Sequence, residues 1–303
     1  MKASNRMQRV LFRIVVALAV VALLAVVYSA SEKPEPAVTL PKPNGYDDFV
    51  AAGKMLAIDA GNWDDLEIDK LRSVLETNKP VFALVRKGLT RTSQFPTDYS
   101  QTDFPRYLSD LGNMKHLAQA LSADGKLAEA EGRNDDAAED YATTIELGAE
   151  ANRGGFLIHS LVDDAIEAIG AKKLTAIVSI LSAQESRQCL QALVKAETDR
   201  DSFDKIKAQE KLFYLHAPLR EKLADLPLRL IGRDGMAASL AKTESKYIAS
   251  VLLIRKLSVQ LAAHAFELEK GRPATNWSDL VPGYLASIPN DPTKNRPIAF
   301  DSW

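Results

Sequence analysis

Apolar side chains recur along most of this chain at intervals of three and four residues, the spacing of one face of an α-helix. Stretches of alternating β-branched residues, which are typical of half-buried strands, are nearly absent. The pattern therefore predicts a mainly α fold. The clearest apolar stripes run through Phe49, Ala52, Met55 and Leu56, through Ile68, Leu71, Val74 and Leu75, through Leu157, Leu161, Val162, Ile166 and Ile169, and through Tyr247, Val251, Ile254, Leu257, Leu261 and Phe266.

Local signals predict where several of these helices begin and end. Ser182 and Glu185 have the spacing of a capping box, in which each residue satisfies an unpaired backbone donor at the start of a helix. Gly271 is typical of the residue that ends a helix, and Pro273 follows it. The other elements expected are a short helix Pro80–Leu89, a loop over residues 90–106, a connector over residues 218–235 and a long helix Lys242–Lys270.

The N-terminus contains a different pattern, an apolar run preceded by cations. Residues 10–30 make up about 21 residues, or roughly 31 Å of helix, which is enough to cross the hydrocarbon core of a bilayer. We therefore predict a transmembrane anchor. The uninterrupted run Ile14–Tyr28 is about 15 residues long and also fits the apolar region of a signal peptide, with a weak cleavage signal at residues 29–31.

The distribution of charge predicts the orientation of this span. Its four flanking cations, Lys2, Arg6, Arg9 and Arg13, all lie on the N-terminal side, which the positive-inside rule places in the cytoplasm. In a bacterial cell the protein would be a single-pass protein of the inner membrane with its C-terminal domain in the periplasm. The expected organisation is a cytoplasmic tip and anchor at 1–32, a proline-rich linker at 33–45, a helical domain at 46–235, and a long helix with a C-terminal module at 236–303.

Residues 113–150 combine two helical patterns with a glycine turn. Gly132 suits the turn between two helices, Ala137 allows close helix approach, and Tyr141 can fill the groove between them. This stretch resembles one tetratricopeptide-type helical hairpin, and it has no second copy at the same period. The resemblance implies a solenoid-like helical domain with a groove that binds a protein partner.

The last part of the chain, residues 245–300, is a long helix followed by Gly271-Arg-Pro, a short segment that ends at Tyr284-Leu, and Ile288-Pro-Asn-Asp-Pro. This order is similar to the C-terminal segment of type II secretion pseudopilins. The resemblance implies a small helix-plus-strand module, and we expect Trp277 to be largely buried against the long helix. The glutamate that a prepilin carries within its N-terminal apolar helix is missing.

Composition narrows the classes of partner. The chain has 303 residues, with 38 lysines and arginines against 40 aspartates and glutamates, so no strong field attracts nucleic acid. Cys189 is the only cysteine, which excludes an internal disulfide. We expect a membrane partner through residues 10–30 and an unidentified protein partner, but no nucleic acid.

Residues with catalytic chemistry are present but do not form a motif. The histidines, His116, His159, His216 and His264, are far apart and have no metal-ligand spacing. Cys189 is interpreted as a packing residue. No catalytic, cofactor-binding or metal-ligating residue is therefore predicted, and no cofactor is expected.

Paired acids occur at several predicted helix starts, where a carboxylate opposes the helix dipole. These pairs are Asp47 with Asp48, Asp64 with Asp65, and Asp135 with Asp136. Asp163, Asp164 and Glu167 differ because they lie inside an otherwise apolar helix. We expect these three acids either to be structural or to bind a cation or a basic partner.

The predicted function is a non-enzymatic protein-interaction or scaffold module of the cell envelope. Two alternatives remain open at this point. One is a hydrolase-like enzyme whose site is assembled from residues that form no motif, and the other is a component of a secretion or pilus-like system.

The predicted topology is tested by a reporter fused after Trp303. A fused reporter that functions only in the periplasm should show activity, because everything after Lys33 is expected outside the cytoplasm. N-terminal sequencing of the mature protein separates the anchor from the signal peptide. A mature N-terminus at Glu32 would show that the apolar run is cleaved.

Overall fold

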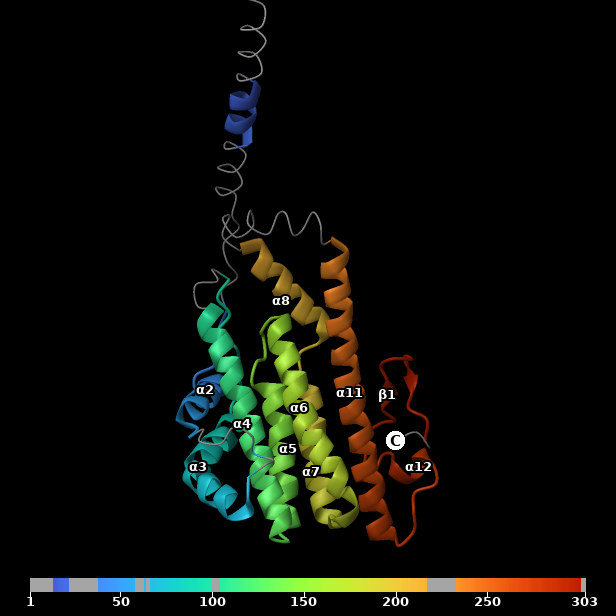
Figure 1. The fold of residues 1–303 in the computed structure, drawn as a ribbon. Coiled ribbons are helices and arrows are strands. Elements are labelled where there is room, and N and C mark those ends of the chain that lie inside the picture. The colour runs from blue at the N-terminus through green and yellow to red at the C-terminus, as the bar shows by residue number, and fades with distance from the viewer. Residues whose placement is uncertain are drawn as a thin grey trace, which may run out of the picture.

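The fold was analysed in a computed structural model that describes residues 13–21, 38–57, 63, 66–99, 104–216 and 233–300. This part of the chain is mainly helical, as the apolar spacing predicts (Figure 1). The elements after the helix of residues 13–21 are α2 (Gly45–Met55), α3 (Ile68–Leu89), α4 (Phe104–Ala130), α5 (Asn134–Glu150), α6 (Leu157–Ile177), the 3₁₀ turn η2 (Val178–Ile180), α7 (Ala183–Asp199), α8 (Phe203–His216), α11 (Arg233–Lys270), α12 (Trp277–Leu280), β1 (Asn290–Asp291) and β2 (Arg296–Pro297).

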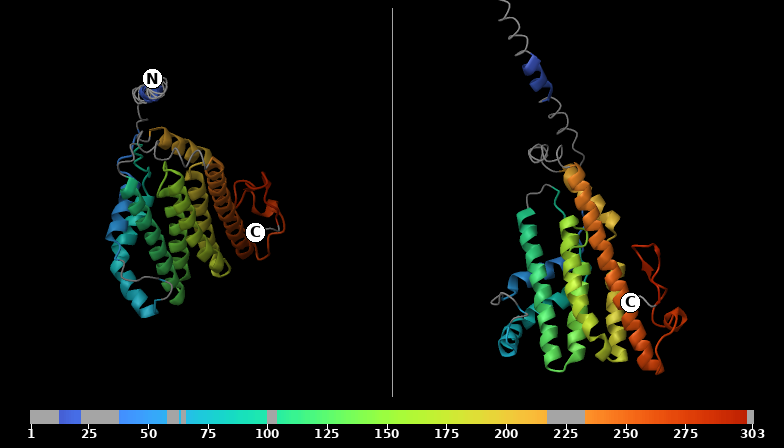
Figure 2. Two further views of the ribbon diagram at one scale, coloured as in Figure 1. Left: turned by 45° about the horizontal axis from the view of Figure 1, so that its top comes forward. Right: turned by 45° about the vertical axis from the view of Figure 1, so that its right-hand side comes forward.

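The long helices α4, α5, α6, α7 and α11 lie side by side and form one elongated body (Figures 1 and 2). Helices α2 and α3 pack on the α4 side, and α8 crosses obliquely at one end. Helix α5 contacts both α6 and α7, and α11 packs along the same two helices. Helix α6 is therefore covered by α5 on one side and by α11 on another.

Two clusters of buried apolar side chains stabilise the body. The first lies among α2, α3, α4 and the segment after α3, where Phe49, Phe82 and Phe95 are almost completely buried. The second joins α5, α6, α7, α11 and the C-terminal tail. Its best-buried members include Ile145, Leu174, Leu193, Leu261 and Leu280.

The hairpin α4–α5 has the local features expected from its sequence. Gly132 adopts a φ of 74° at the turn, a conformation that favours glycine. Tyr141 is fully buried against Gly125, where an added Cβ would lie 2.5 Å from Tyr141 Cε1. The tyrosine ring thus occupies the space left by the missing side chain. The resemblance to tetratricopeptide hairpins itself stays a prediction.

Two helix boundaries expected from the sequence are wrong. Pro80 does not start a helix but lies inside the continuous helix α3. The neighbouring Asn78 side chain is buried and bonds both the Ala57 amide and the Val74 carbonyl, which ties this turn of α3 to α2. Helix α11 begins at Arg233 rather than at Lys242, and the rest of the expected connector lies outside the described residues.

The C-terminal tail packs on α11 through Leu280, Leu285 and Ile298, all of which are buried. Asn276 caps the single turn of α12, and β1 pairs with β2 in an antiparallel ladder of two residues each. Trp277 is of intermediate exposure and packs against the second core cluster, with its ring edge-on to that of Phe300 at 5.4 Å.

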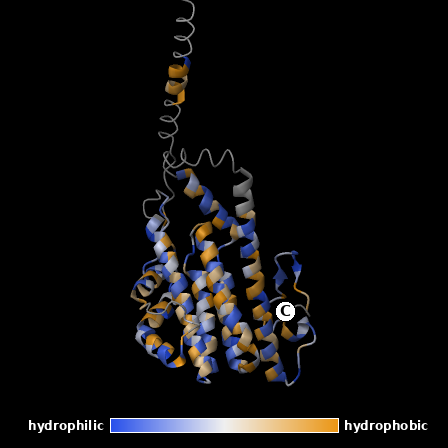
Figure 3. Ribbon diagram, in the orientation of Figure 1, coloured by the Kyte–Doolittle hydropathy of each residue, from blue (hydrophilic) through white to orange (hydrophobic). Residues whose placement is uncertain are grey.

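The predicted membrane span is described only over residues 13–21, which form an exposed and mainly hydrophobic helix apart from the body (Figure 3). Residues 10–12 and 22–30, and residues 33–37 of the linker, lie outside the described part. Within the described part, Leu240–Lys270 is long and apolar enough to cross a membrane. Half of its most apolar stretch is buried, and Ile254, Leu257 and Leu261 belong to the second core cluster. The apolar composition of residues 240–270 is therefore explained by the position of this helix in the protein core.

The Gly125–Tyr141 contact can be tested with two alanine substitutions in α4. Gly125→Ala should lower the free energy of unfolding by about 1–3 kcal/mol, because its Cβ would overlap the buried Tyr141 ring. Gly112→Ala is the control, since nothing lies within 4 Å of its Cβ. That change should be neutral or raise stability by up to about 1 kcal/mol. Urea unfolding of both variants measures the difference, and equal effects would contradict the packing.

Candidate functional site

The histidines do not converge on a common site. His116 is exposed on α4, and His264 on α11 bonds the Leu181 carbonyl at 3.0 Å. His216 stacks on Tyr99, and His159 is buried, with its Nδ1 accepting a hydrogen bond from the Phe156 amide at the start of α6. Burial lowers the pKa of His159 to about 3, so this imidazole is neutral.

Cys189 is equally unsuited to catalysis. Its thiol is buried on α7 and lies 3.8 Å from the Ala138 carbonyl oxygen. Burial raises the pKa of Cys189 to about 12, which keeps it as the unreactive thiol. Within the described residues, no group of three or more His, Cys, Asp or Glu side chains is arranged to hold a metal ion.

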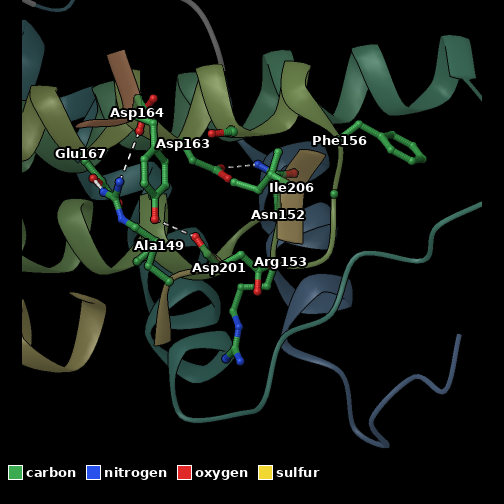
Figure 4. Close-up of a pocket in the computed structure, with 14 residues that line it drawn as sticks. Ala149, Asn152, Arg153, Phe156, Asp163, Asp164, Glu167, Asp201 and Ile206 are labelled. Atoms are coloured by element: carbon green, nitrogen blue, oxygen red, sulfur yellow. Dashed lines mark hydrogen bonds and ion pairs between the residues drawn. The ribbon is translucent and has the colours of Figure 1, made fainter. Parts of the chain in front are cut away.

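The internal acids of α6 do come together, around a small cavity (Figure 4). The cavity is lined by the end of α5, the α5–α6 turn, α6, the turn after α7, α8 and α11. Gly154, with a φ of 79°, allows the tight α5–α6 turn that brings Asn152 against α6. The polar side chains around the cavity are Asn152, Arg153, Ser160, Asp163, Asp164, Glu167, Arg200, Asp201 and Tyr247.

Arg200 is the cation that balances these acids. Its guanidinium forms an ion pair with Glu167 and lies 3.4 Å from Asp164 Oδ1, and all three side chains are almost entirely buried. Ser250 of α11 donates to Glu167 at 2.7 Å. We call Asp163, Asp164, Glu167, Arg200 and Ser250 the Arg200 junction. The counter-charge for Asp164 and Glu167 thus comes from the chain itself, from an arginine that belongs to no sequence motif.

Two acceptor atoms of this cavity have no partner in the described structure. They are Asn152 Oδ1 and Asp164 Oδ2, and both are buried from water. Asn152 also donates from Nδ2 to Asp163 Oδ1 at 2.6 Å. Loss of water raises the pKa of Asp163 well above its ordinary value, and burial raises the pKa of Asp164 to about 6 against the opposing effect of Arg200.

The cavity has a volume of about 30 Å³. That is room for one or two water molecules and not for an organic substrate. The acids therefore converge without leaving space for a reacting molecule. Their geometry supports a structural junction, not a catalytic centre.

A second hollow lies between α5 and α7 on the surface and has a volume of about 280 Å³. Its floor consists of small residues, and its rim carries carboxylates. We call it the α5–α7 groove. Its lining residues are Asp135, Asp136, Ala138, Glu139, Ala142, Thr143, Glu146, Gln184, Glu185, Gln188, Cys189 and Ala192.

The lining of the α5–α7 groove holds five carboxylates and no lysine, arginine or histidine, while Arg133 and Arg86 pair from outside the lining with Asp136 and Glu139. Asp135 hydrogen-bonds with Glu185, and this contact raises the pKa of Asp135. Burial likewise raises the pKa of Glu146.

The Arg200 junction can be tested by removing its cation. Arg200→Met should lower the free energy of unfolding by about 3–5 kcal/mol, because it leaves buried carboxylates without a counter-charge. Arg72→Met is the control, since Arg72 pairs with Asp69 and Glu131 at the surface, where solvent screens the charges and the pairs contribute little to stability. Urea unfolding of the full-length protein in detergent gives both values. Similar losses in the two variants would contradict a buried junction.

Comparison of the chain with known proteins finds no matching family model, no matching curated protein and no matching solved structure. The likenesses to a tetratricopeptide hairpin and to a pseudopilin segment therefore rest on the sequence alone. A function has to be inferred from the shape and charge of the α5–α7 groove and from the chemistry of the Arg200 junction.

Proposed function

We propose that this chain is a membrane-anchored, extracytoplasmic helical protein that acts as a non-enzymatic interaction or scaffold module. The observation that carries the proposal is the α5–α7 groove, with its rim of carboxylates and its floor of small side chains. The partner that suits this surface is a protein segment rich in lysine or arginine.

The shape of the groove supports this choice of partner. Ala138, Ala142 and Ala192 leave the floor shallow enough for a side-chain stem to lie on it. Long basic side chains place an apolar stem on such a floor while their charged ends reach carboxylates at the rim. Complementary charge gives specificity and speeds encounter, since opposite potentials attract before contact.

The rest of the proposed architecture brings this surface to the membrane. Residues 10–30 form the single-pass anchor, the proline-rich residues 33–45 act as a spacer, and the module faces the periplasm of a bacterial cell. The α4–α5 hairpin acts as a tetratricopeptide-like unit, and residues 245–300 form a pseudopilin-like helix-plus-strand module. The exposed apolar helix of residues 13–21 supports the anchor.

A hydrolase-like activity is less well supported. The acids that converge around Arg200 surround a cavity of about 30 Å³, which is too small for a substrate. A role in a secretion or pilus-like system is the second candidate. The tail that packs on α11 through Leu280 and Leu285 favours it, because a docked tail suits a structural module of such a system.

The groove is tested by adding one positive charge to it. Gln188→Lys should weaken binding of a fluorescent lysine-rich helical peptide to the full-length protein in lipid nanodiscs by about tenfold, or about 1.4 kcal/mol. Gln191→Lys is the matched control, because Gln191 is exposed on the same helix but does not line the groove. Fluorescence anisotropy measures both affinities, and binding should weaken as salt is added.

Equal affinities for wild type and Gln188→Lys would contradict the groove as the binding surface. Equal losses in Gln188→Lys and Gln191→Lys would show a general charge effect instead. Absence of any peptide binding at low salt would contradict the basic partner.

A further inference from the structure

The side chain of Asp163 is the one acid of the α6 cluster without a cation. Arg200 pairs with Glu167 and lies beside Asp164, and Lys205 pairs with Asp201 at 2.5 Å. Among the described residues, no ion pair includes Asp163. An ionised carboxylate there would be compensated only by the charge of Arg200, which forms no ion pair with it, and it would lie next to the negative charge of Asp164 and Asp201.

The groups that face this acid come from every element around it. Helix α6 itself supplies Asp164 and Glu167. Figure 4 shows Arg153 extending away from the acids, and its guanidinium lies 3.3 Å from Glu150. The remaining neighbours are Asn152 from the α5–α6 turn, Arg200 and Asp201 after α7, Ile206 of α8, and Lys246, Tyr247 and Ser250 of α11.

The side-chain amide of Asn152 contains an acceptor atom that lacks a hydrogen-bond donor. Its Nδ2 already donates to Asp163 Oδ1 at 2.6 Å, while its own Oδ1 is buried without a donor. The Asp163 carboxyl group already contacts this amide, so it is the protein group placed to supply the missing donor. A neutral carboxylic acid carries one O–H donor, whereas a carboxylate carries none.

We propose that Asp163 is held as the neutral acid and that its O–H donates to Asn152 Oδ1. Together with the existing Nδ2–H to Oδ1 bond, this closes a ring of two hydrogen bonds between an acid and an amide. The ring ties α6 to the α5–α6 turn. Loss of the proton to water breaks one bond and leaves an uncompensated carboxylate, so the ring is a latch that opens as pH rises.

The latch has consequences beyond the two side chains, because the α5–α6 turn holds other segments in place. The Phe95 amide donates to the Arg153 carbonyl at 2.7 Å. The Gly154 amide donates to Asp201 Oδ2 at 2.6 Å. Opening the latch would therefore loosen the segment after α3 and the turn before α8 together. The half-buried position of Asp163 allows proton exchange with solvent.

The direction of the pH effect follows from linkage. Because the pKa of Asp163 is raised in the folded state, its contribution to stability is fully present below the ordinary aspartate value and is lost as pH rises through the folded value. Within that window the unfolding equilibrium constant of wild type should rise about tenfold per pH unit relative to that of Asp163→Asn. The amide in this variant cannot ionise.

The experiment is urea unfolding of the full-length protein in detergent across this pH range, for wild type, Asp163→Asn and the exchanged variant Asn152→Asp with Asp163→Asn. The exchanged variant restores an acid and an amide in reversed positions, so it should regain the pH dependence. Asp69→Asn, at an exposed site, should leave it unchanged. Parallel pH profiles for wild type and Asp163→Asn would overturn the proposal.

Two further measurements keep the test decisive if a variant folds poorly. The infrared spectrum of wild type minus that of Asp163→Asn at neutral pH should contain the carbonyl band of a protonated carboxylic acid; the subtraction removes the band of Asp140, whose pKa burial raises to about 8. Amide exchange at residues 152–157 should accelerate with pH beyond the intrinsic rate. Absence of the infrared band at neutral pH would show that Asp163 is ionised, and would overturn the proposal.

Discussion

Compensation of buried negative charge is the constraint on which the arrangement of α6, α7 and α11 depends. Glu167 and Asp164 point from α6 into the protein, and buried carboxylates are tolerated only when they are paired or protonated. Arg200 follows the last residue of α7 and supplies the counter-charge at the point where the chain turns toward α8. The ion pair therefore fixes both the end of α7 and the position of α11, which contributes Ser250.

The acids that line the α5–α7 groove lie on the faces of α5 and α7 that other helices leave uncovered. Helices α6 and α11 cover the inner faces of α5 and α7, where Ile145 and Leu193 are buried. The polar faces of the two helices are left side by side. The protein thus holds one set of carboxylates around Arg200 in its interior and another along the α5–α7 groove, while the buried Asp140 and Glu150 pair with Arg86 and Arg153.

Helix periodicity and capping signals predicted much of the fold, but they could not predict contacts between residues that are distant in the sequence. The capping box of Ser182 and Glu185 and the helix end at Gly271 depend on neighbouring residues, and both are present. Pro80 was misplaced because the tertiary contacts of α3 override a local signal. The ion pairs of Arg200 with acids more than thirty residues away could not be predicted from the sequence. A single arginine in a turn belongs to no recognisable sequence pattern. The α5–α7 groove could not be predicted from the sequence either, since its two rims come from different helices.

The most direct test of this account is a double substitution at the centre of the Arg200 junction. Arg200→Met combined with Glu167→Met replaces the buried ion pair with apolar side chains. Replacing both partners of such a pair is often neutral, whereas removing one leaves an uncompensated buried charge. Urea unfolding should therefore show the double variant to be more stable than Arg200→Met alone. A double variant that loses the sum of the two single effects would contradict charge compensation as the organising constraint.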